Sequence, residues 1–531
     1  MSVLLSDPRI PPDAPDTLIE AESPRSLLAR RRRGDWLLFA AIFITMVLAV
    51  PPLMWLGTTN GFGLVIGVAV SLAAALAVVR KPEIGLFLVL ACVVLVEENP
   101  LTIPDGTDRL NIFYWPERIA GLPERPIGFL FLFILFMFAS QRFVRWQRAL
   151  RGGELLAPLL LFLAAVLIGV VHGITSGGDF KIIVLEIRPF WYLFVGYLLA
   201  YNTVTRREHV SAFIWIVILG AGVKALQGAY ITFVVLHGDL AGYNEIMSHE
   251  ESFFWVALLL LIFLFALHHR QRGQLIAALA LVPFTGISLV ANNRRADYVA
   301  LLVAILVAWV LLIAIRPARR AGLVTGLVIC LLLGTAYVAA FSHSGGAFAQ
   351  PARAVISTIH PDTSDARDYS SNLYRQIENA DLKFTIKQSP IIGYGFGKPF
   401  LQPVLLPNIL DLDPYYLFVP HNTIYWVWMR LGFVGFLALW YIFGSIIVRG
   451  CQIARRLRDP YLQLVAVYVV AVTFMEVILA YADYQLFFYR NVIYLGLLCG
   501  LLLNLPKLDR ADREYAEKDA EKDAEKELPA L

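Results

Sequence analysis

The feature that most constrains this chain is the recurrence of long apolar runs along its whole length. Many of these runs contain about 18 or more residues, enough for a helix to cross the ~30 Å hydrocarbon core of a bilayer. Hydrophobic residues make up 58% of the sequence and charged residues only 16%, whereas soluble domains carry about 25% charged residues. The sequence therefore predicts an all-α polytopic membrane protein and argues against a soluble catalytic domain.

We expect about fourteen transmembrane helices (12–14) within a transmembrane domain at residues 36–504. They are expected near residues 36–56, 62–80, 84–96, 127–141, 155–173, 187–202, 209–236, 252–268, 274–292, 297–316, 322–342, 422–448, 461–482 and 486–504.

The placement of Lys and Arg predicts the orientation, because cytoplasmic connections are enriched in these residues. Every second connection is basic, beginning with the Arg30 to Arg33 run before the first helix. The intervening connections are acidic, mixed or nearly uncharged. We therefore predict an inner (cytoplasmic) membrane protein with both termini cytoplasmic. Residues 1–35 would be a cytoplasmic extension, and residues 505–531 a charged cytoplasmic tail.

One outside connection, residues 343–420, is long enough to form a large periplasmic loop. Its stretch SNLYRQIENADLKFTIKQ has helical spacing and good helix formers. The next stretch, SPIIGYGFGKPF, carries Pro390, Gly393 and Gly395, which break regular structure. The loop is thus expected to contain a helix followed by an irregular glycine-rich segment.

A pair of arginines departs from the orientation pattern. Arg294 and Arg295 stand together in VANNRRADYVALL, on the side where the pattern disfavours positive charge. A charge at a membrane edge is costly and is a candidate functional group. The alternative interpretation is snorkelling of both side chains to lipid headgroups, with Asp297 as a partner.

Two further candidates lie in and after the large loop. Arg375 falls in the expected loop helix, where a solvated charge or a partner of Glu378 is the alternative. His421 stands where the loop enters the next membrane helix, in FVPHNTIYWVWMRLGFVGF. A structural role is the alternative there, with His421 or Asn422 capping the helix.

Together these segments resemble the O-antigen ligase and O-antigen polymerase superfamily, bacterial membrane proteins that join lipid-linked glycans. The matching pieces are NNRRADYVALL, then YRQIENADLKFTIKQSPIIGYGFG, then HNTIYWVWMRLGFVG. The similarity covers residues 275–450, which we take as the O-antigen ligase-like region, and implies a GT-C-like fold. Members commonly show a single Arg followed by Gly, so either arginine of Arg294-Arg295-Ala296 is the equivalent, with RADYVALL favouring Arg295.

The resemblance implies an undecaprenyl-diphosphate-linked glycan as donor and a sugar hydroxyl, on a glycan or lipid A core, as acceptor. It implies a polymerase, a ligase or a protein O-glycosyltransferase. Guanidinium groups suit the diphosphate because they stay charged and present a planar fork. We therefore expect Arg294 or Arg295 and Arg375 to hold it. An imidazole titrates near neutral pH, so His421 is expected to act as base or to orient the acceptor in an inverting transfer.

Further substrate contacts are expected at Asn422, Gly393, Gly395 and Tyr425, and at Arg188 in LEIRPFWYLF, whose alternative is pairing with Glu186. No metal site and no cofactor are expected. The nearest metal candidates, PDGTD at residues 104–108 and SHEES at residues 248–252, read better as a turn and a solvated acidic run.

The competing function class is a membrane transporter or flippase of lipid-linked oligosaccharides. Transporters more often show inverted repeats and charges at mid-membrane depth, whereas the candidates here gather at one face. A structural or sensory membrane protein is the third class. Membrane lipids are the expected surroundings, and no nucleic-acid partner is expected.

Overall fold

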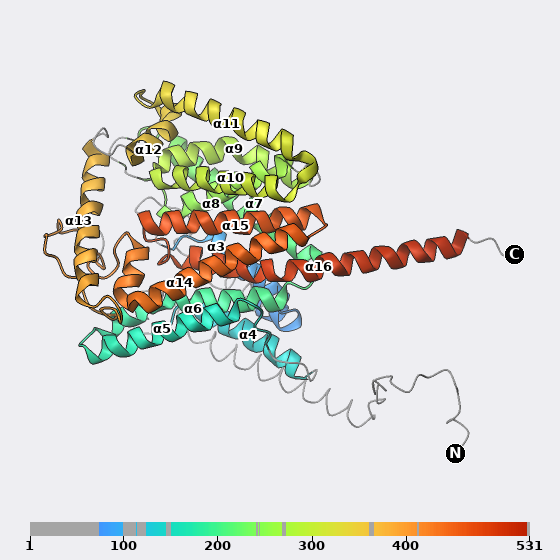
Figure 1. Ribbon diagram of the computed structural model, residues 1–531, viewed down its shortest axis with the longest axis horizontal. Helices are drawn as coiled ribbons and strands as arrows, with labels where there is room; N and C mark the ends of the chain where they lie inside the picture. Colours follow the sequence, from blue (N-terminus) through green and yellow to red (C-terminus); the bar gives the residue numbers. More distant parts are fainter. Residues whose placement is uncertain are drawn as a thin grey trace, which may run out of the picture. The chain divides into compact units, whose positions relative to one another are not determined.

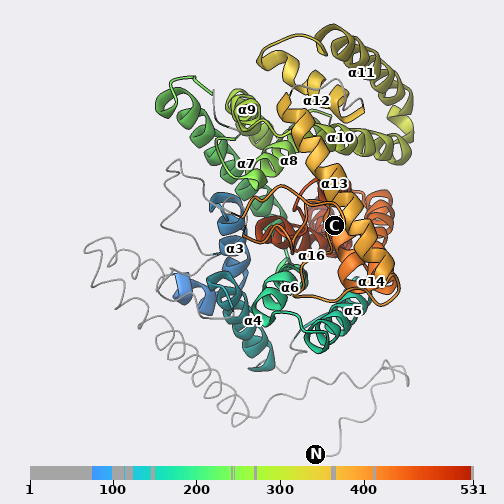
Figure 2. The same cartoon turned by 90° about the vertical axis from the view of Figure 1, so that its left-hand side faces the viewer.

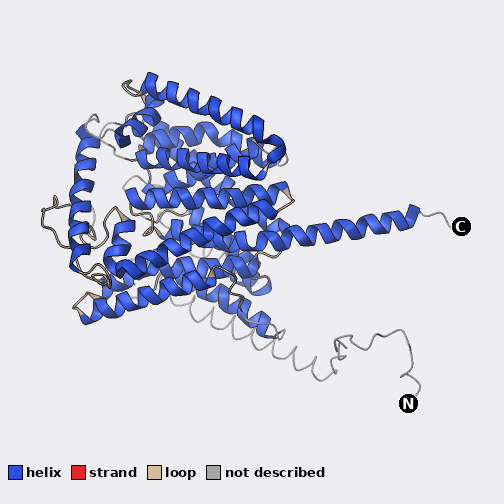
Figure 3. Ribbon diagram, in the orientation of Figure 1, coloured by secondary structure: helices blue, strands red, loops and turns tan. Residues whose placement is uncertain are grey.

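The computed structural model describes residues 74–98, 113, 124–144, 150–240, 243, 245–267, 272–359, 366–410 and 414–527. In this part of the chain all regular structure is helical (Figures 1 and 3). The α-helices are α3 (Glu83–Leu95), α4 (Pro126–Val144), α5 (Leu156–Thr175), α6 (Phe180–Thr203), α7 (Arg207–Tyr230), α8 (His249–Ala266), α9 (Arg272–Asn292), α10 (Arg295–Ile315), α11 (Arg320–Phe341), α12 (Gln350–Ile359), α13 (Ala366–Gln388), α14 (Thr423–Arg456), α15 (Pro460–Ala482) and α16 (Tyr489–Glu527). A π-helical turn, Ile231–Val235, extends α7, and short 3-10 turns precede α11 and α12.

Chain contacts define two compact units. One comprises Met1–Pro82 with Leu135–Ala149, and the other Glu83–Ile134 with Leu150–Leu531. Within the first, the Gln141 side chain donates to the Val79 carbonyl at 2.6 Å. All sites discussed below lie in the second unit.

The predicted helical membrane architecture is confirmed within the described residues. Eleven helices there are long and apolar enough to cross a membrane, and each corresponds to an expected one. The expected helix at residues 84–96 is α3, whose 13 residues fall short of a full crossing. The expected helix at residues 36–56, most of the one at 62–80 and the extension at residues 1–35 lie outside the described residues, so the total of fourteen stays a prediction.

Two helix boundaries differ from the sequence expectation. Helix α6 begins at Phe180 rather than near residue 187, because the Asp179 carboxylate caps it, accepting from the backbone N–H of Lys181 at 2.7 Å and of Ile182 at 3.3 Å. Helix α16 runs through Pro506 and continues to Glu527. The charged tail is therefore helical over most of its length.

The large connection at residues 343–420 contributes α12 and α13. Helix α13 lies across one end of the membrane helices, as Figures 1 and 2 both show. The C-terminal part of α16 leaves from the opposite end (Figure 1). We call the end that carries α13 the α13 face.

The glycine-rich segment after α13 packs into a break in α14. At Gly432 the backbone leaves the helical region, with φ 65° and ψ −169°. The segment fills the gap: Tyr394 N–H donates to Met429 O at 2.6 Å, Gly395 N–H to Arg430 O at 3.1 Å, and Phe433 N–H to Pro390 O at 2.8 Å. The break thus gives the backbone groups of α14 partners in the loop, which fixes the loop to the membrane helices.

Replacing Gly432 with alanine is expected to destabilise the fold by about 2 kcal/mol or more. A left-handed φ costs an L-residue about 1–2 kcal/mol, and an added Cβ would lie 2.0 Å from the Ile391 carbonyl oxygen. Thermal unfolding of the detergent-solubilised protein measures the effect. The matched control is Gly444→Ala in the same helix, where an added Cβ meets nothing within 4 Å. Equal melting temperatures for the two variants would contradict the prediction.

Candidate functional site

The site is organised by one side of α13. Asn372, Arg375 and Glu378 are three residues apart in this helix, so their side chains lie on the same face. Two of them hold groups of the membrane helices, Asn372 at the start of α10 and Glu378 at the start of α14. Arg375 stands between these two attachments.

His421 is held by Glu378 through two hydrogen bonds. Its backbone N–H donates to Glu378 Oε2 at 3.0 Å, and its ring Nδ1 lies 3.1 Å from Glu378 Oε1. The Glu378 side chain is only 1% exposed, whereas that of His421 is 19% exposed. The carboxylate is therefore shielded behind the imidazole, which remains accessible.

Aromatic rings fix the plane of the imidazole. The Tyr484 ring lies 4.4 Å from it, centroid to centroid, at an interplanar angle of 31°, and the Tyr374 ring meets it edge-on at 5.5 Å. Among the described residues, none forms a hydrogen bond with Nε2. Because Nδ1 is engaged by a carboxylate, Nε2 is the nitrogen left to act on a ligand.

Arg295, the first residue of α10, joins two parts of the large connection. Its Nη1 donates to Ser357 Oγ in α12 at 3.2 Å, and its Nη2 to Asn372 Oδ1 in α13 at 3.3 Å. Both of these acceptors are uncharged.

Arg375 makes no hydrogen bond or ion pair within the described part of the chain, and its Nε is buried without a partner. Burial lowers the pKa of Arg375 below its ordinary value; the Asp483 carboxylate opposes this shift, and the Arg294 charge adds to it. A guanidinium nevertheless stays protonated in proteins. The site thus contains a positive charge with unused donors, which is the arrangement that binds an anion.

Arg294 is engaged in ion pairs instead. Its Nη2 pairs with Asp483, its Nη1 lies 3.0 Å from His249 Nε2, and Glu245 lies 3.8 Å away. Burial alone would raise the pKa of Asp483, but Arg294 and His249 hold it well below its usual range. A carboxylate with a depressed pKa stabilises the fold at and above its ordinary pKa of about 3.9 and loses that contribution only as pH falls through the lower folded value. The pair is therefore charged at neutral pH.

Asn422 caps α14, as one of the two sequence alternatives proposed. Its Oδ1 accepts from Tyr425 N–H at 3.0 Å, and its Nδ2 donates to Asn379 Oδ1 in α13 at 2.9 Å. The Tyr425 ring lies under the Lys383 ammonium at 5.5 Å. Both residues therefore lie at the junction of α13 and α14, beside His421.

Three further residues predicted to contact substrate, Gly393, Gly395 and Arg188, contact other parts of the protein. A Cβ on Gly393 would meet the Arg430 carbonyl at 2.4 Å, and one on Gly395 would meet Gly173 N at 2.9 Å, so both glycines pack against backbone. Arg188 is buried in α6 and donates to the Tyr489 hydroxyl at 2.7 Å. Its neighbour Glu186 pairs with Arg430 at 2.5 Å. The structure thus places Gly393, Gly395 and Arg188 in packing interactions.

Of the two stretches considered as metal sites in the sequence, one pairs with arginine side chains of the protein and the other lies outside the described residues. In the SHEES stretch, His249 contacts Arg294, and Glu250 and Glu251 both pair with the buried Arg490. The PDGTD stretch lies outside the described residues. Within the described residues, no group of three or more His, Cys, Asp or Glu side chains is arranged to hold a metal ion.

Sequence reasoning missed Asp483 and Glu245 and gave Glu378 a different partner. The sequence suggested Arg375, three residues earlier, as a partner for Glu378, whereas Glu378 binds His421. Its position near the middle of the amphipathic loop helix was the available signal. No local signal marks Asp483, because its partner Arg294 is 189 residues away.

Comparison with known proteins supports the resemblance. Residues 280–440 match the O-antigen ligase family model. A stretch of 66 residues is 36% identical to an O-antigen ligase of Salmonella typhimurium (strain LT2), covering 12% of this chain and 16% of that relative. The match thus spans about a sixth of the relative's length. The matched region contains Arg294, Arg295, Arg375 and His421, so these residues lie in the part of this multi-pass membrane protein that is similar to the O-antigen ligase family.

Proposed function

We propose that this protein is a glycosyltransferase that transfers a glycan from an undecaprenyl-diphosphate donor to a sugar hydroxyl of an acceptor glycan or lipid A core. The observation that carries the proposal is the single face of α13 that presents Arg375, with unused donors, between Arg295 and the His421–Glu378 pair. The polymerase and ligase reactions share this chemistry and differ in the acceptor.

The α13 face is proposed to be the periplasmic one. The basic connections predicted to be cytoplasmic, such as those around Arg316 and Arg455, belong to the opposite ends of helices that start or finish at this face. A lipid diphosphate in the outer leaflet would lie at the depth of Arg294 and Arg295, which stand where the apolar helix α10 begins.

Arg375 and Arg295 are proposed to hold the diphosphate. As the glycosidic bond breaks, negative charge grows on the leaving diphosphate, and fixed guanidinium groups stabilise that charge without reorganising. Arg294 is less suited to direct contact, because Asp483 already neutralises it. We therefore assign Arg295 and Arg375 to the donor and give Arg294 a positioning role. This arrangement supplies two positive charges from the protein, and we propose that transfer is metal-independent.

His421 is proposed to be the general base. The acceptor oxygen attacks the anomeric carbon from the side opposite the diphosphate, so the configuration inverts. The electron pair of the broken C–O bond leaves on the diphosphate oxygen, and the hydroxyl proton moves to His421 Nε2. Glu378 keeps Nδ1 engaged and stabilises the imidazolium that forms, as a carboxylate does for an imidazole base in other enzymes.

The function is tested by deleting the gene and analysing the glycan that accumulates on the lipid carrier. Single repeats on the carrier identify a polymerase, and a full-length polymer left on the carrier identifies a ligase. An unchanged glycan profile would refute the proposal. Accumulation of the carrier-linked glycan on the cytoplasmic leaflet would instead identify a flippase. Transfer by the purified protein in the presence of EDTA tests the metal independence.

A further inference from the structure

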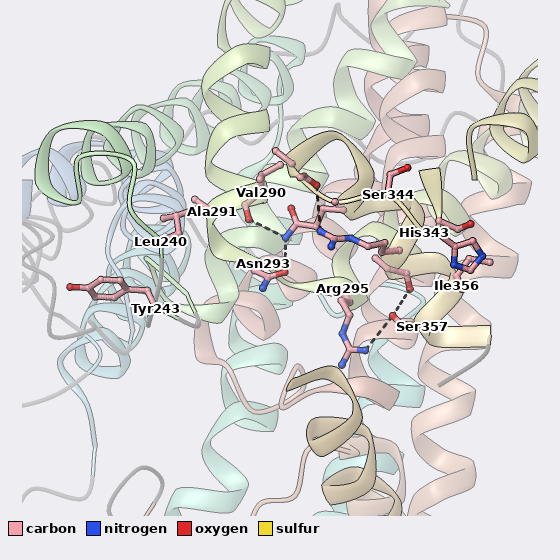
Figure 4. A pocket seen from close by; sticks show the side chains of 17 residues that line it. Leu240, Tyr243, Val290, Ala291, Asn293, Arg295, His343, Ser344, Ile356 and Ser357 are labelled. Atoms are coloured by element: carbon pink, nitrogen blue, oxygen red, sulfur yellow. Dashed lines mark hydrogen bonds between the residues drawn. The ribbon is translucent and has the colours of Figure 1, made fainter. Parts of the chain in front are cut away.

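A polar pocket lies next to the site just described, beyond Arg295. It has a volume of about 670 Å³ (Figure 4). Its walls are the end of α9, the start of α10, helix α12 and the segment between α11 and α12, with Leu240 and Tyr243 from the connection before α8. This volume is in the range of pockets that bind small molecules. The described residues that line it include Arg295, Arg353 and His343 and no Asp or Glu. The pocket therefore favours an anionic or strongly polar ligand.

The wall of the pocket is held by buried polar side chains. Gln350 at the start of α12 is 9% exposed and Ser357 is 6% exposed. Gln350 Nε2 donates to Asn293 Oδ1 at 2.5 Å and to the Val290 carbonyl at 3.1 Å, which fastens α12 to the end of α9. Asn293 itself has a left-handed φ of 48°. Asparagine commonly takes this conformation directly after a helix, so Asn293 ends α9 at the pocket.

Arg295 links this pocket to the α13 face. Figure 4 shows its guanidinium beside Ser357, with which it forms a hydrogen bond of 3.2 Å. Its other terminal nitrogen reaches Asn372, on the same side of α13 as Arg375. A molecule in the pocket would therefore lie next to the proposed diphosphate position, separated from it by one side chain.

We propose that this pocket binds an anionic group, a phosphate or a carboxylate, carried by a sugar of the acceptor glycan. The inference rests on the proposed function. The assignment to the acceptor follows from the division of the arginines: Arg295 and Arg375 are assigned to the donor diphosphate, so the other arginine of the pocket, Arg353, is left for the second substrate. Arg353 donates to the Gly346 carbonyl at 3.4 Å and is exposed, so its charge is available to a ligand.

The test measures binding of glucose 6-phosphate, glucose and inorganic phosphate to the purified full chain in a phosphate-free non-ionic detergent. Glucose 6-phosphate is expected to bind more tightly than either glucose or inorganic phosphate, and Arg353→Gln to weaken its binding at least fivefold. The control is Arg320→Gln, which removes an exposed charge at the other end of α11 and should leave the Kd unchanged. Equal binding to wild type and Arg353→Gln, or equal binding of glucose and glucose 6-phosphate, would overturn the proposal.

Two further measurements separate the alternatives. If vesicles containing phosphatidylglycerol displace glucose 6-phosphate while phosphatidylcholine vesicles do not, the pocket is a lipid-headgroup site and the acceptor assignment fails. In transfer assays, Arg353→Gln should raise KM for a phosphorylated acceptor with little change in kcat. A His421→Ala protein should bind glucose 6-phosphate normally. Normal transfer by that variant would refute the proposed function and leave the binding result standing.

Discussion

Replacing Arg375 with alanine is expected to reduce glycan transfer by about 10²- to 10³-fold. Removing one preorganised donor to a developing negative charge costs on the order of 3 kcal/mol in the barrier. The loss should appear in kcat as well as in kcat/KM, because the charge on the diphosphate grows in the transition state. Transfer from a purified undecaprenyl-diphosphate glycan, followed by chromatography of the product, measures it.

The fold of the Arg375→Ala protein should be preserved, since its guanidinium makes no hydrogen bond or ion pair within the described residues. Lys387→Ala is the matched control: it removes an exposed positive charge from the last turn of the same helix. Arg375→Lys keeps the charge but loses the planar fork, so it should recover only part of the rate. Near-normal transfer by Arg375→Ala, Arg295→Ala and His421→Ala alike would eliminate the enzymatic interpretation.

The features that the sequence predicted best are local ones. Apolar run length predicted the membrane helices, and helical spacing in SNLYRQIENADLKFTIKQ predicted α13. The sequence offered His421 or Asn422 as a cap of the following helix, and the structure shows that Asn422 is the cap. Each of these depends on interactions within a few residues, so a single sequence is sufficient to recognise it.

The features that could not be predicted depend on residues distant in the chain. The ion pair between Arg294 and Asp483 joins positions 189 residues apart. The packing of the glycine-rich segment on a break in α14 depends on the backbone angles at Gly432, which the sequence does not reveal. Periodicity predicts an element and its exposed side but not its partner, and the division of roles among the arginines depends on the partner.

Replacing Glu378 with glutamine is expected to slow transfer by about 10²- to 10⁴-fold, although the size and shape of the side chain are kept. The carboxylate accepts from the backbone N–H of His421 with one oxygen and engages Nδ1 with the other. An amide has one accepting oxygen and one donating nitrogen. If its oxygen keeps the backbone N–H, its NH₂ faces Nδ1 and requires that nitrogen to be unprotonated. The proton then resides on Nε2, which can no longer act as a base.

The tautomer gives a measurement that a merely structural role for Glu378 would not change. In protein labelled with ¹⁵N-histidine, the His421 signal, identified by its loss in His421→Gln, should change from the Nδ1-protonated to the Nε2-protonated form in Glu378→Gln. Glu378→Asp retains both accepting oxygens and should keep the wild-type tautomer with a smaller loss of rate. Asn422→Ala, which removes the adjacent helix cap, tests for general disruption of the junction and should leave the tautomer unchanged. A Glu378→Gln protein that transfers glycan slowly but keeps Nδ1 protonated would show that the carboxylate acts through its charge, because the imidazole would then still be correctly prepared to accept the proton.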